Sequence, residues 1–108
     1  DGTGERDYIH VEDIAEAHLL ALNNVDKTTN NIFNLGSNTS FSVLQIIDNV
    51  ENILHKKVNF SIVDPRPGDP AILTTNFEKA KDRIGWTPQK TITDIVESAY
   101  NWRNKPLY

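Results

Sequence analysis

Residues 1–18 read DGTGERDYIHVEDIAEAH, and they join a glycine-containing turn to the start of a helix. A Gly-x-Gly pair invites comparison with the phosphate-binding turn of dinucleotide-binding proteins, Gly-x-Gly-x-x-Gly. The position that would carry the third glycine is Asp7, so this motif is incomplete. Gly2 and Gly4 are therefore interpreted as a turn of another kind, whose purpose depends on the residues around it.

A helix is expected directly after this turn, over residues 11–24. Its apolar side chains recur at the i, i+3, i+4, i+7 spacing of one buried stripe: Ile14, Ala17, His18, Ala21, Leu22 and Val25. Leu19 and Leu20 lie beside that stripe, so the apolar face is wide. Because His18 falls on the stripe, we expect it to be a buried core residue.

Two strands are expected from short apolar runs. Residues 31–35 (NIFNL) are stopped by Gly36, and residues 58–63 alternate apolar with polar side chains, the pattern of a half-buried strand. Residues 64–70 (DPRPGDP) hold three prolines and a glycine, which predicts a loop. Two strands make a poor sheet by themselves, which favours a chain that is part of something larger.

A second helix is expected to begin at Ser42, because Gln45 follows at capping-box spacing. Its apolar stripe is Val43, Ile46, Ile47, Val50, Ile53 and Leu54. Asn76 is suited to cap a short third helix over residues 77–84, which Gly85 ends in a left-handed conformation.

A last helix is expected to open at Thr91 or Thr93 and to run to about residue 104. Its apolar face consists of Ile92, Ile95, Val96, Ala99 and Trp102. Trp86 and Trp102 stand near helix ends, where large aromatic side chains most often pack into a core.

Composition narrows the class of protein. The chain has 108 residues with a net charge of −4, enough for one domain and without a basic stripe for nucleic acid. No long apolar run suggests a membrane segment, and the absence of cysteine excludes disulfides and thiolate metal sites. We expect a cytoplasmic globular protein. Because the sequence also lacks methionine, we expect it to be a fragment of a longer product.

Arg6 and Arg66 are the cations with most chemical interest, since each lies in a stretch that cannot be a regular helix. Two planar guanidinium groups from separate loops could hold a diphosphate. The alternative is that both are surface arginines paired with nearby carboxylates, for which the candidates are Glu5, Asp7, Asp64 and Asp69.

Asp69 has two interpretations of equal weight. Its carboxylate could accept hydroxyl groups of a ribose, or it could cap its own turn through an Asx bond. His10, Asp13 and His18 invite a metal site, but their spacing is loose. Asp13 is better explained as an acid that favours the start of a helix. No nucleophile–base pair is recognisable.

Five stretches, taken in order, resemble the C-terminal portion of the UDP-glucose 4-epimerases, within the extended short-chain dehydrogenase/reductase family. They are DGTGERDYIHVEDIAEAHLLAL (1–22), FNLGS (33–37), FSVLQII (41–47), RPGDPA (66–71) and IGWTP (84–88). The resemblance covers essentially the whole chain. The first stretch is highly specific, RPGDPA is fairly so, and IGWTP is shared more widely.

The resemblance implies an α/β fold, the substrate-binding portion of an extended Rossmann-type epimerase with few short strands and without the Rossmann core. Residues 1–36 would complete the missing NAD-binding domain, and residues 37–108 would form the substrate-binding domain. The first helix would then pack on strands outside this chain and leave apolar surface exposed here, so we expect the fragment to self-associate.

The resemblance also implies roles for single residues. Arg6 and Arg66 would contact the nucleotide diphosphate, Asp69 the uridine ribose, and Tyr8 would line the same pocket. Gly2 and Gly4 would shape the turn that delivers Arg6 to these phosphates. Leu73 would lie beside the sugar. Its intermediate bulk suggests UDP-glucose and UDP-galactose as substrates and leaves N-acetylated sugars open.

A whole enzyme of this kind, an isomerase of galactose metabolism and by resemblance a homodimer, would hold NAD in its N-terminal domain. It would oxidise the sugar C4 hydroxyl to a ketone and return the hydride to the other face. The Tyr-x-x-x-Lys pair is absent here, since Tyr8 is followed by Glu12 and Tyr100 by Asn104. We therefore expect no catalytic residue, no bound NAD and no metal in this chain, only UDP-sugar binding.

Two alternatives stay open at this stage. The chain could belong to a related sugar-nucleotide dehydratase or decarboxylase, which residues outside it would decide. It could also be a non-catalytic module that binds nucleotide sugars.

Overall fold

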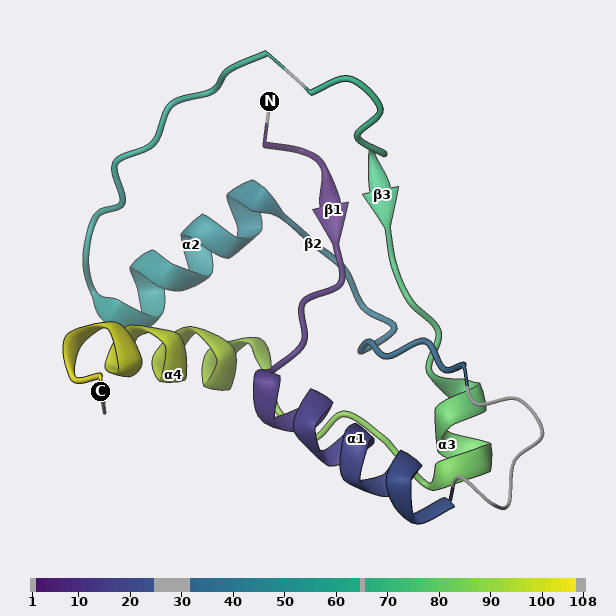
Figure 1. Cartoon of the computed structure of the whole chain (residues 1–108). Helices are drawn as coiled ribbons and strands as arrows, with labels where there is room; N and C mark the ends of the chain where they lie inside the picture. Colours follow the sequence, from purple (N-terminus) through teal and green to yellow (C-terminus); the bar gives the residue numbers. More distant parts are fainter. Residues whose placement is uncertain (1, 25–31, 65, 107–108) are drawn as a thin grey trace.

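The structure is a computed structural model that describes residues 2–24, 32–64 and 66–106. Within these ranges the helices are α1 (Val11–Asn24), α2 (Val43–Leu54), α3 (Glu78–Ile84) and α4 (Ile92–Asn104), and the strands are β1 (Glu5–Arg6), β2 (Phe41–Ser42) and β3 (Ile72–Leu73). The helices pair as α1 with α3 and α2 with α4, and Figure 1 shows these pairs on two sides of the molecule, with the strands beside α2. The α/β class is as expected.

The buried core lies between α1 and α3. Ala17, Ala80, Ile84 and Trp86 form one cluster, and the Trp86 ring, fully buried, meets Phe77 edge-on with the centroids 5.9 Å apart. The Trp86 indole Nε1–H donates to the Asp13 carbonyl oxygen at 2.8 Å, so the burial of this polar group is compensated. The prediction that Trp86 is a core residue is confirmed.

The small sheet has the order β2-β1-β3, with β1 antiparallel to β2 and parallel to β3. In register, Arg6 lies opposite Phe41 on one side and opposite Leu73 on the other. Backbone bonds from Glu5 N to Ala71 O (2.7 Å) and from Asp7 N to Leu73 O (3.2 Å) extend the β1–β3 contact. The sheet therefore brings the first stretch of the chain against residues 71–73.

Both strands predicted from the sequence are wrong. Residues 32–35 and 58–63 are irregular, and residue 31 lies outside the described part. A strand needs a neighbour that completes its backbone hydrogen bonds, and within the described ranges the sheet consists of β1, β2 and β3 alone. Phe33 and Leu35 instead pack against the core, while Phe60, Ile62 and Val63 are exposed.

The predicted helices are confirmed to within a residue or two. Ser42 and Gln45 form the expected capping box of α2, and Thr91 with Asp94 forms one at α4, so Thr91 and not Thr93 is the cap. Asn76 Oδ1 accepts from Glu78 N at 2.8 Å, and Gly85 ends α3 with a φ of 71°. Local capping signals therefore located the starts of α2 and α4 and the end of α3, whereas the N-cap of α3 is Phe77, without a side-chain cap bond, and not the expected Asn76.

Two side chains expected in the core lie outside it. His18 is exposed, and its Nδ1 is 2.8 Å from the Ile14 carbonyl oxygen one turn earlier. Trp102 is 48% exposed at the far end of α4. The His18 prediction assumed that the whole apolar stripe of α1 is buried, whereas the buried residues of this helix are Asp13 and Ala17.

The outer side of α1 carries large apolar side chains in solvent. Val11 is 72%, Leu19 59% and Leu22 71% exposed, which confirms the expected apolar surface on this helix. In the described ranges, no helix combines the length and the apolar character needed to cross a membrane.

Candidate functional site

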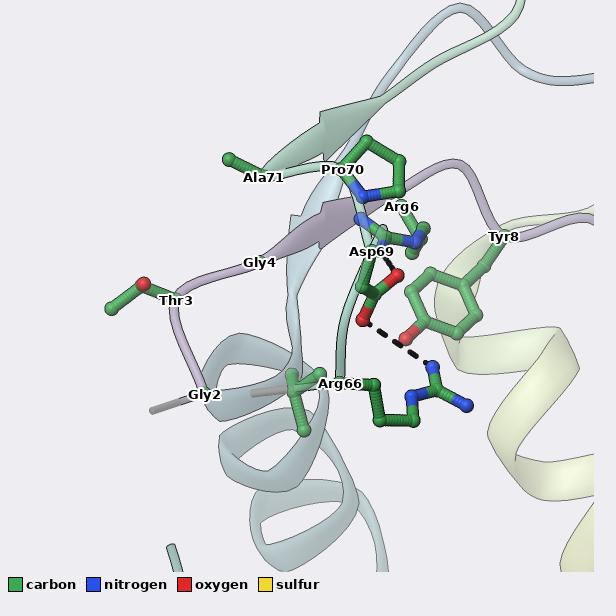
Figure 2. Close-up of a pocket in the computed structure, with 10 residues that line it drawn as sticks. Gly2, Thr3, Gly4, Arg6, Tyr8, Arg66, Asp69, Pro70 and Ala71 are labelled. Carbon is green, nitrogen blue, oxygen red and sulfur yellow. Dashed lines mark hydrogen bonds and ion pairs between the residues drawn. The ribbon is translucent and has the colours of Figure 1, made fainter. Parts of the chain in front are cut away.

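Four of the five predicted site residues, Arg6, Tyr8, Arg66 and Asp69, meet at a pocket of about 470 Å³. Its lining comes from the first stretch, the start of α2 and the proline-containing loop: Gly2, Thr3, Gly4, Arg6, Tyr8, Val43, Arg66, Asp69, Pro70 and Ala71. Figure 2 shows Arg6, Tyr8, Arg66 and Asp69 gathered on one side of this pocket. Leu73 is not among the lining residues; it is 55% exposed on β3, beside Arg6 in register.

The glycine turn is fixed against the start of α2. Gly2 has a φ of 85°, a conformation that side chains disfavour, and a Cβ there would lie 2.8 Å from Leu44 Cγ. The carbonyl oxygens of Gly2 and Gly4 accept from Leu44 N at 3.1 Å and from Val43 N at 3.3 Å. The turn thus satisfies backbone donors at the first turn of α2 and leads the chain into β1, which carries Arg6.

The loop that carries Arg66 and Asp69 closes on itself. Asp69 N donates to Arg66 O at 3.3 Å, and Gly68 between them has a φ of 77°. One interpretation of the sequence was that the Asp69 side chain caps this turn through an Asx bond. Instead the backbone N–H of Asp69 closes the turn, which leaves the carboxylate for other partners. The loop then joins β1 through the Glu5–Ala71 bond described above.

The Asp69 carboxylate lies between the two arginines. Its Oδ1 is 2.5 Å from Arg6 Nη2 and its Oδ2 is 3.3 Å from Arg66 Nη2, as the dashed lines in Figure 2 show. The hydrogen bond from Arg6, and then that from Arg66, lowers the pKa of Asp69 below its ordinary value of 3.8. The carboxylate is therefore ionised at neutral pH.

The two guanidinium groups differ in freedom. Arg6 also donates from Nη1 to the Glu5 carbonyl oxygen at 2.7 Å, and its side chain is only 26% exposed. The Arg66 side chain is 84% exposed. The Arg6 side chain is thus held by protein contacts, whereas that of Arg66 lies largely in solvent. The ion-pair alternative is correct in naming Asp69 as their partner, and the same pairing gathers both cations at one pocket.

Asp7, which the sequence offered only as a surface partner for the arginines, organises the backbone around the site. Its carboxylate accepts from Ser37 N (2.9 Å), Ser37 Oγ (2.6 Å), Asn38 N (3.0 Å) and Thr75 N (3.3 Å). It thereby ties the segment between Arg6 and Tyr8 to two other loops. Gly36 is required beside it, because a Cβ there would lie 2.7 Å from Asp7 Oδ2 and 2.5 Å from Thr75 Cβ.

The second cluster of candidate residues is structural in its contacts. Asp13 is buried and accepts from Gln89 N at 3.1 Å and Lys90 N at 2.9 Å, so it fixes the loop before α4 as well as standing in the first turn of α1. Among the described residues no group of three or more His, Asp or Glu side chains is arranged to hold a metal ion. The metal interpretation of His10, Asp13 and His18 therefore gains no support.

His10 is buried and contacts Ser98, but the pair is not a nucleophile with its base. Glu12 N donates to His10 Nδ1 at 3.0 Å, so the proton of a neutral ring is on Nε2. Nε2–H then donates to Ser98 Oγ at 2.8 Å, and Ser98 Oγ donates to the Ile95 carbonyl oxygen at 3.1 Å. With this arrangement the imidazole cannot accept the serine proton.

The chain is similar to known sugar-nucleotide enzymes along nearly all of its length. Residues 1–99 match the family model described as GDP-mannose 4,6 dehydratase. The chain is 43% identical to the UDP-glucose 4-epimerase of Corynebacterium glutamicum, over 93% of this chain and 31% of that enzyme.

Solved structures agree with this likeness. The UDP-glucose 4-epimerase of Bifidobacterium longum, crystallised in complex with NAD+ and UDP, is 38% identical with a TM-score of 0.91, over 98% of this chain and 32% of that one. The enzyme from Stenotrophomonas maltophila, with bound NAD and formylated UDP-arabinopyranose, is 36% identical with a TM-score of 0.86, over 96% and 31%.

The chain thus spans about a third of the length of the relatives it matches. The sequence identity, the near-complete coverage of this chain and the fold agree with the same group of enzymes. The chain belongs to the sugar-nucleotide epimerase and dehydratase family and corresponds to the C-terminal portion of the UDP-glucose 4-epimerases.

Proposed function

We propose that this chain binds the UDP part of UDP-glucose and UDP-galactose within a UDP-glucose 4-epimerase. The observation that carries the proposal is the convergence of Arg6 and Asp69, 63 positions apart in the sequence, with Tyr8 and Arg66 at one pocket. Two guanidinium groups at one pocket form a cradle for a diphosphate, whose oxygens accept two parallel N–H bonds from each fork.

The remaining groups of the pocket suit the nucleoside and the sugar. The Asp69 carboxylate can accept both hydroxyls of a ribose, and the half-buried Tyr8 offers a ring face and a hydroxyl. Leu73 stands beside Arg6 in the sheet, which is compatible with a sugar next to the phosphates. We propose that Leu73 lies beside the sugar, where its intermediate bulk suits UDP-glucose and UDP-galactose and leaves N-acetylated sugars open.

The described part of the chain does not show the glycine turn and long strand that a dinucleotide site uses. Gly2 and Gly4 bond to the start of α2 instead of forming a dinucleotide turn, and the strands of the described part are two residues long. NAD, with which both structural relatives were crystallised, is therefore assigned to the rest of a longer enzyme, where it supplies oxidation and reduction at C4. This chain would hold UDP in place while the keto-sugar turns, and residues 1–36 would complete the NAD-binding domain beside residues 37–108.

The chain alone is proposed to be inactive, since it lacks the Tyr-x-x-x-Lys pair. Incubation of the purified chain with UDP-galactose and NAD should give no UDP-glucose above a blank. Measurable conversion would contradict this part of the proposal. A dehydratase or decarboxylase would use the same UDP cradle, and the 43% identity to an epimerase favours epimerisation.

Calorimetry with UDP tests the binding proposal. The chain should bind UDP weakly, and Arg6→Gln should weaken binding by about tenfold or more, the value of a charge-assisted contact to phosphate. Arg83→Gln, an exposed arginine on α3, is the matched control and should leave the affinity unchanged. Binding that Arg6→Gln does not alter would rule out the cradle.

A further inference from the structure

In this structure the position of an anion between Arg6 and Arg66 is taken by the carboxylate of Asp69. One oxygen faces each arginine, at 2.5 Å and 3.3 Å, so the carboxylate bridges the two guanidinium groups as a phosphate oxygen pair would. The bridge is not forced by sequence neighbourhood alone, because Arg6 belongs to β1 and reaches Asp69 only through the fold.

A diphosphate that enters the cradle must replace this carboxylate. The two anions compete for the same N–H donors, and a carboxylate left beside a diphosphate is repelled by it. Asp69 then needs new donors. A ribose supplies them through its vicinal hydroxyls, whereas inorganic pyrophosphate has no such groups.

We propose that Asp69 is an internal competitor that selects nucleoside diphosphates over bare phosphate anions. This inference rests on the proposed function and adds to it a reason for the acidic residue inside a phosphate cradle. The carboxylate weakens every anion that occupies the cradle, and only a ligand with a ribose diol returns hydrogen bonds to it. The carboxylate thus lowers the affinity for every anion, and only the hydrogen bonds from a ribose diol compensate for this loss. The site is therefore selective for nucleoside diphosphates.

The same geometry accounts for the different freedom of the two arginines. Arg6 is held by the Glu5 carbonyl oxygen and stays in place when the carboxylate leaves. Arg66 is 84% exposed and lies three positions before Asp69 on the same turn, so it can move with the turn toward the ligand. Gly68, with its positive φ between the two, is the pivot expected for that movement.

The test compares three ligands by calorimetry at one ionic strength: UDP, 2′,3′-dideoxy-UDP and inorganic pyrophosphate. Asp69→Asn should bind pyrophosphate about three- to tenfold more tightly than the unmodified chain, the scale set by a pair of exposed ionic contacts. The same variant should lose the preference for UDP over its dideoxy analogue. Asp64→Asn removes an equal charge from the same loop and is the control, which should leave both quantities nearly unchanged.

The inference is overturned if Asp69→Asn weakens pyrophosphate, or if Asp64→Asn strengthens it equally, which would indicate only a general effect of charge. If UDP binds through Arg6 and yet these outcomes appear, the proposed function stands and the inference alone fails. Carboxyl ¹³C NMR of the unmodified chain provides a measurement without substitution. Saturating pyrophosphate should shift the Asp69 carboxyl resonance, because the carboxylate leaves the two guanidinium groups. An unchanged resonance would contradict the proposal that Asp69 competes with the anion.

Discussion

At the scale of single residues, the carboxylates of Asp7 and Asp69 do different work within one site. Asp69 faces two side chains, whereas Asp7 faces the backbone of two loops. The sequence predicted the grouping of Arg6, Tyr8, Arg66 and Asp69, because it shows two arginines in stretches that cannot be regular helices, together with a family motif. The sequence could not predict the role of Asp7, because most of its partners are backbone N–H groups. These are the same whatever side chain the distant residue carries.

Replacing Asp7 by Asn should loosen the site from within. An amide presents N–H groups to some of the backbone donors whose hydrogen bonds the carboxylate now accepts, so part-buried donors at Ser37 and Thr75 lose their partner. Unfolding in urea should show a loss of about 1–3 kcal/mol. Asp48→Asn, on the exposed side of α2, is the control and should change little. Equal stability of the two variants would show that the Asp7 contacts are not needed.

Acid should break the ion pairs of Asp69 with Arg6 and Arg66. The pKa of Asp69 is lowered below 3.8, chiefly by its bond from Arg6, so its ion pairs add stability above that pH and are lost as the pH falls through the lowered pKa. A ¹³C titration should place the Asp69 pKa below 3.8, and Arg6→Gln should raise it towards that value. Arg83→Gln should leave it where it was. A pKa of Asp69 at or above 3.8 in the unmodified chain would contradict the ion pairs of this carboxylate with Arg6 and Arg66.

At the scale of elements, helices were predictable and strands were not. The capping boxes at Ser42 and Thr91 join residues a few positions apart, and the apolar side chains of each helix recur at similarly short spacing. Such local patterns can be recognised directly in the sequence. Each observed strand has two residues and exists only through its partners, as Glu5 does between Ser42 and Ile72. Such pairs carry no period that a pattern could reveal.

The capping box of α4 gives a test at this scale. Thr91→Ala removes the side-chain oxygen that accepts from Asp94 N, and should lower the free energy of unfolding by about 1 kcal/mol. Thr93→Ala, two residues further in the exposed first turn, lacks this role and serves as the matched control. Thermal melts followed by circular dichroism measure both, and equal melting temperatures would show that the box adds nothing.

In the molecule as a whole, the pocket that holds Arg6 and Asp69 lies apart from the exposed apolar face of α1. The pocket gathers around β1, whereas Leu19 and Leu22 stand in solvent on α1, below the strands in Figure 1. The sequence foretold this face through a resemblance to enzymes about three times as long. The sequence could not predict that so few residues of α1 are buried, because the apolar spacing of a helix does not show which of its side chains pack against other elements.

The exposed face should drive self-association. Sedimentation velocity of the chain should show oligomers whose share rises with concentration, because large apolar side chains gain by leaving water. The double variant Leu19→Lys and Leu22→Lys should shift the chain towards monomer. Ile62→Lys, equally apolar and exposed in another segment, should not. A monomer at all concentrations would contradict the prediction.

We propose above that UDP binds at the pocket formed by the glycine turn and the proline-containing loop. The most direct test of this proposal is a map of amide shifts in ¹⁵N-labelled chain as UDP is added. We expect the changes to centre on Arg6, Tyr8 and residues 66, 68, 69 and 71, and the amides of α3 to be unaffected. Changes confined to α1 and α3, or none at saturating UDP, would contradict it.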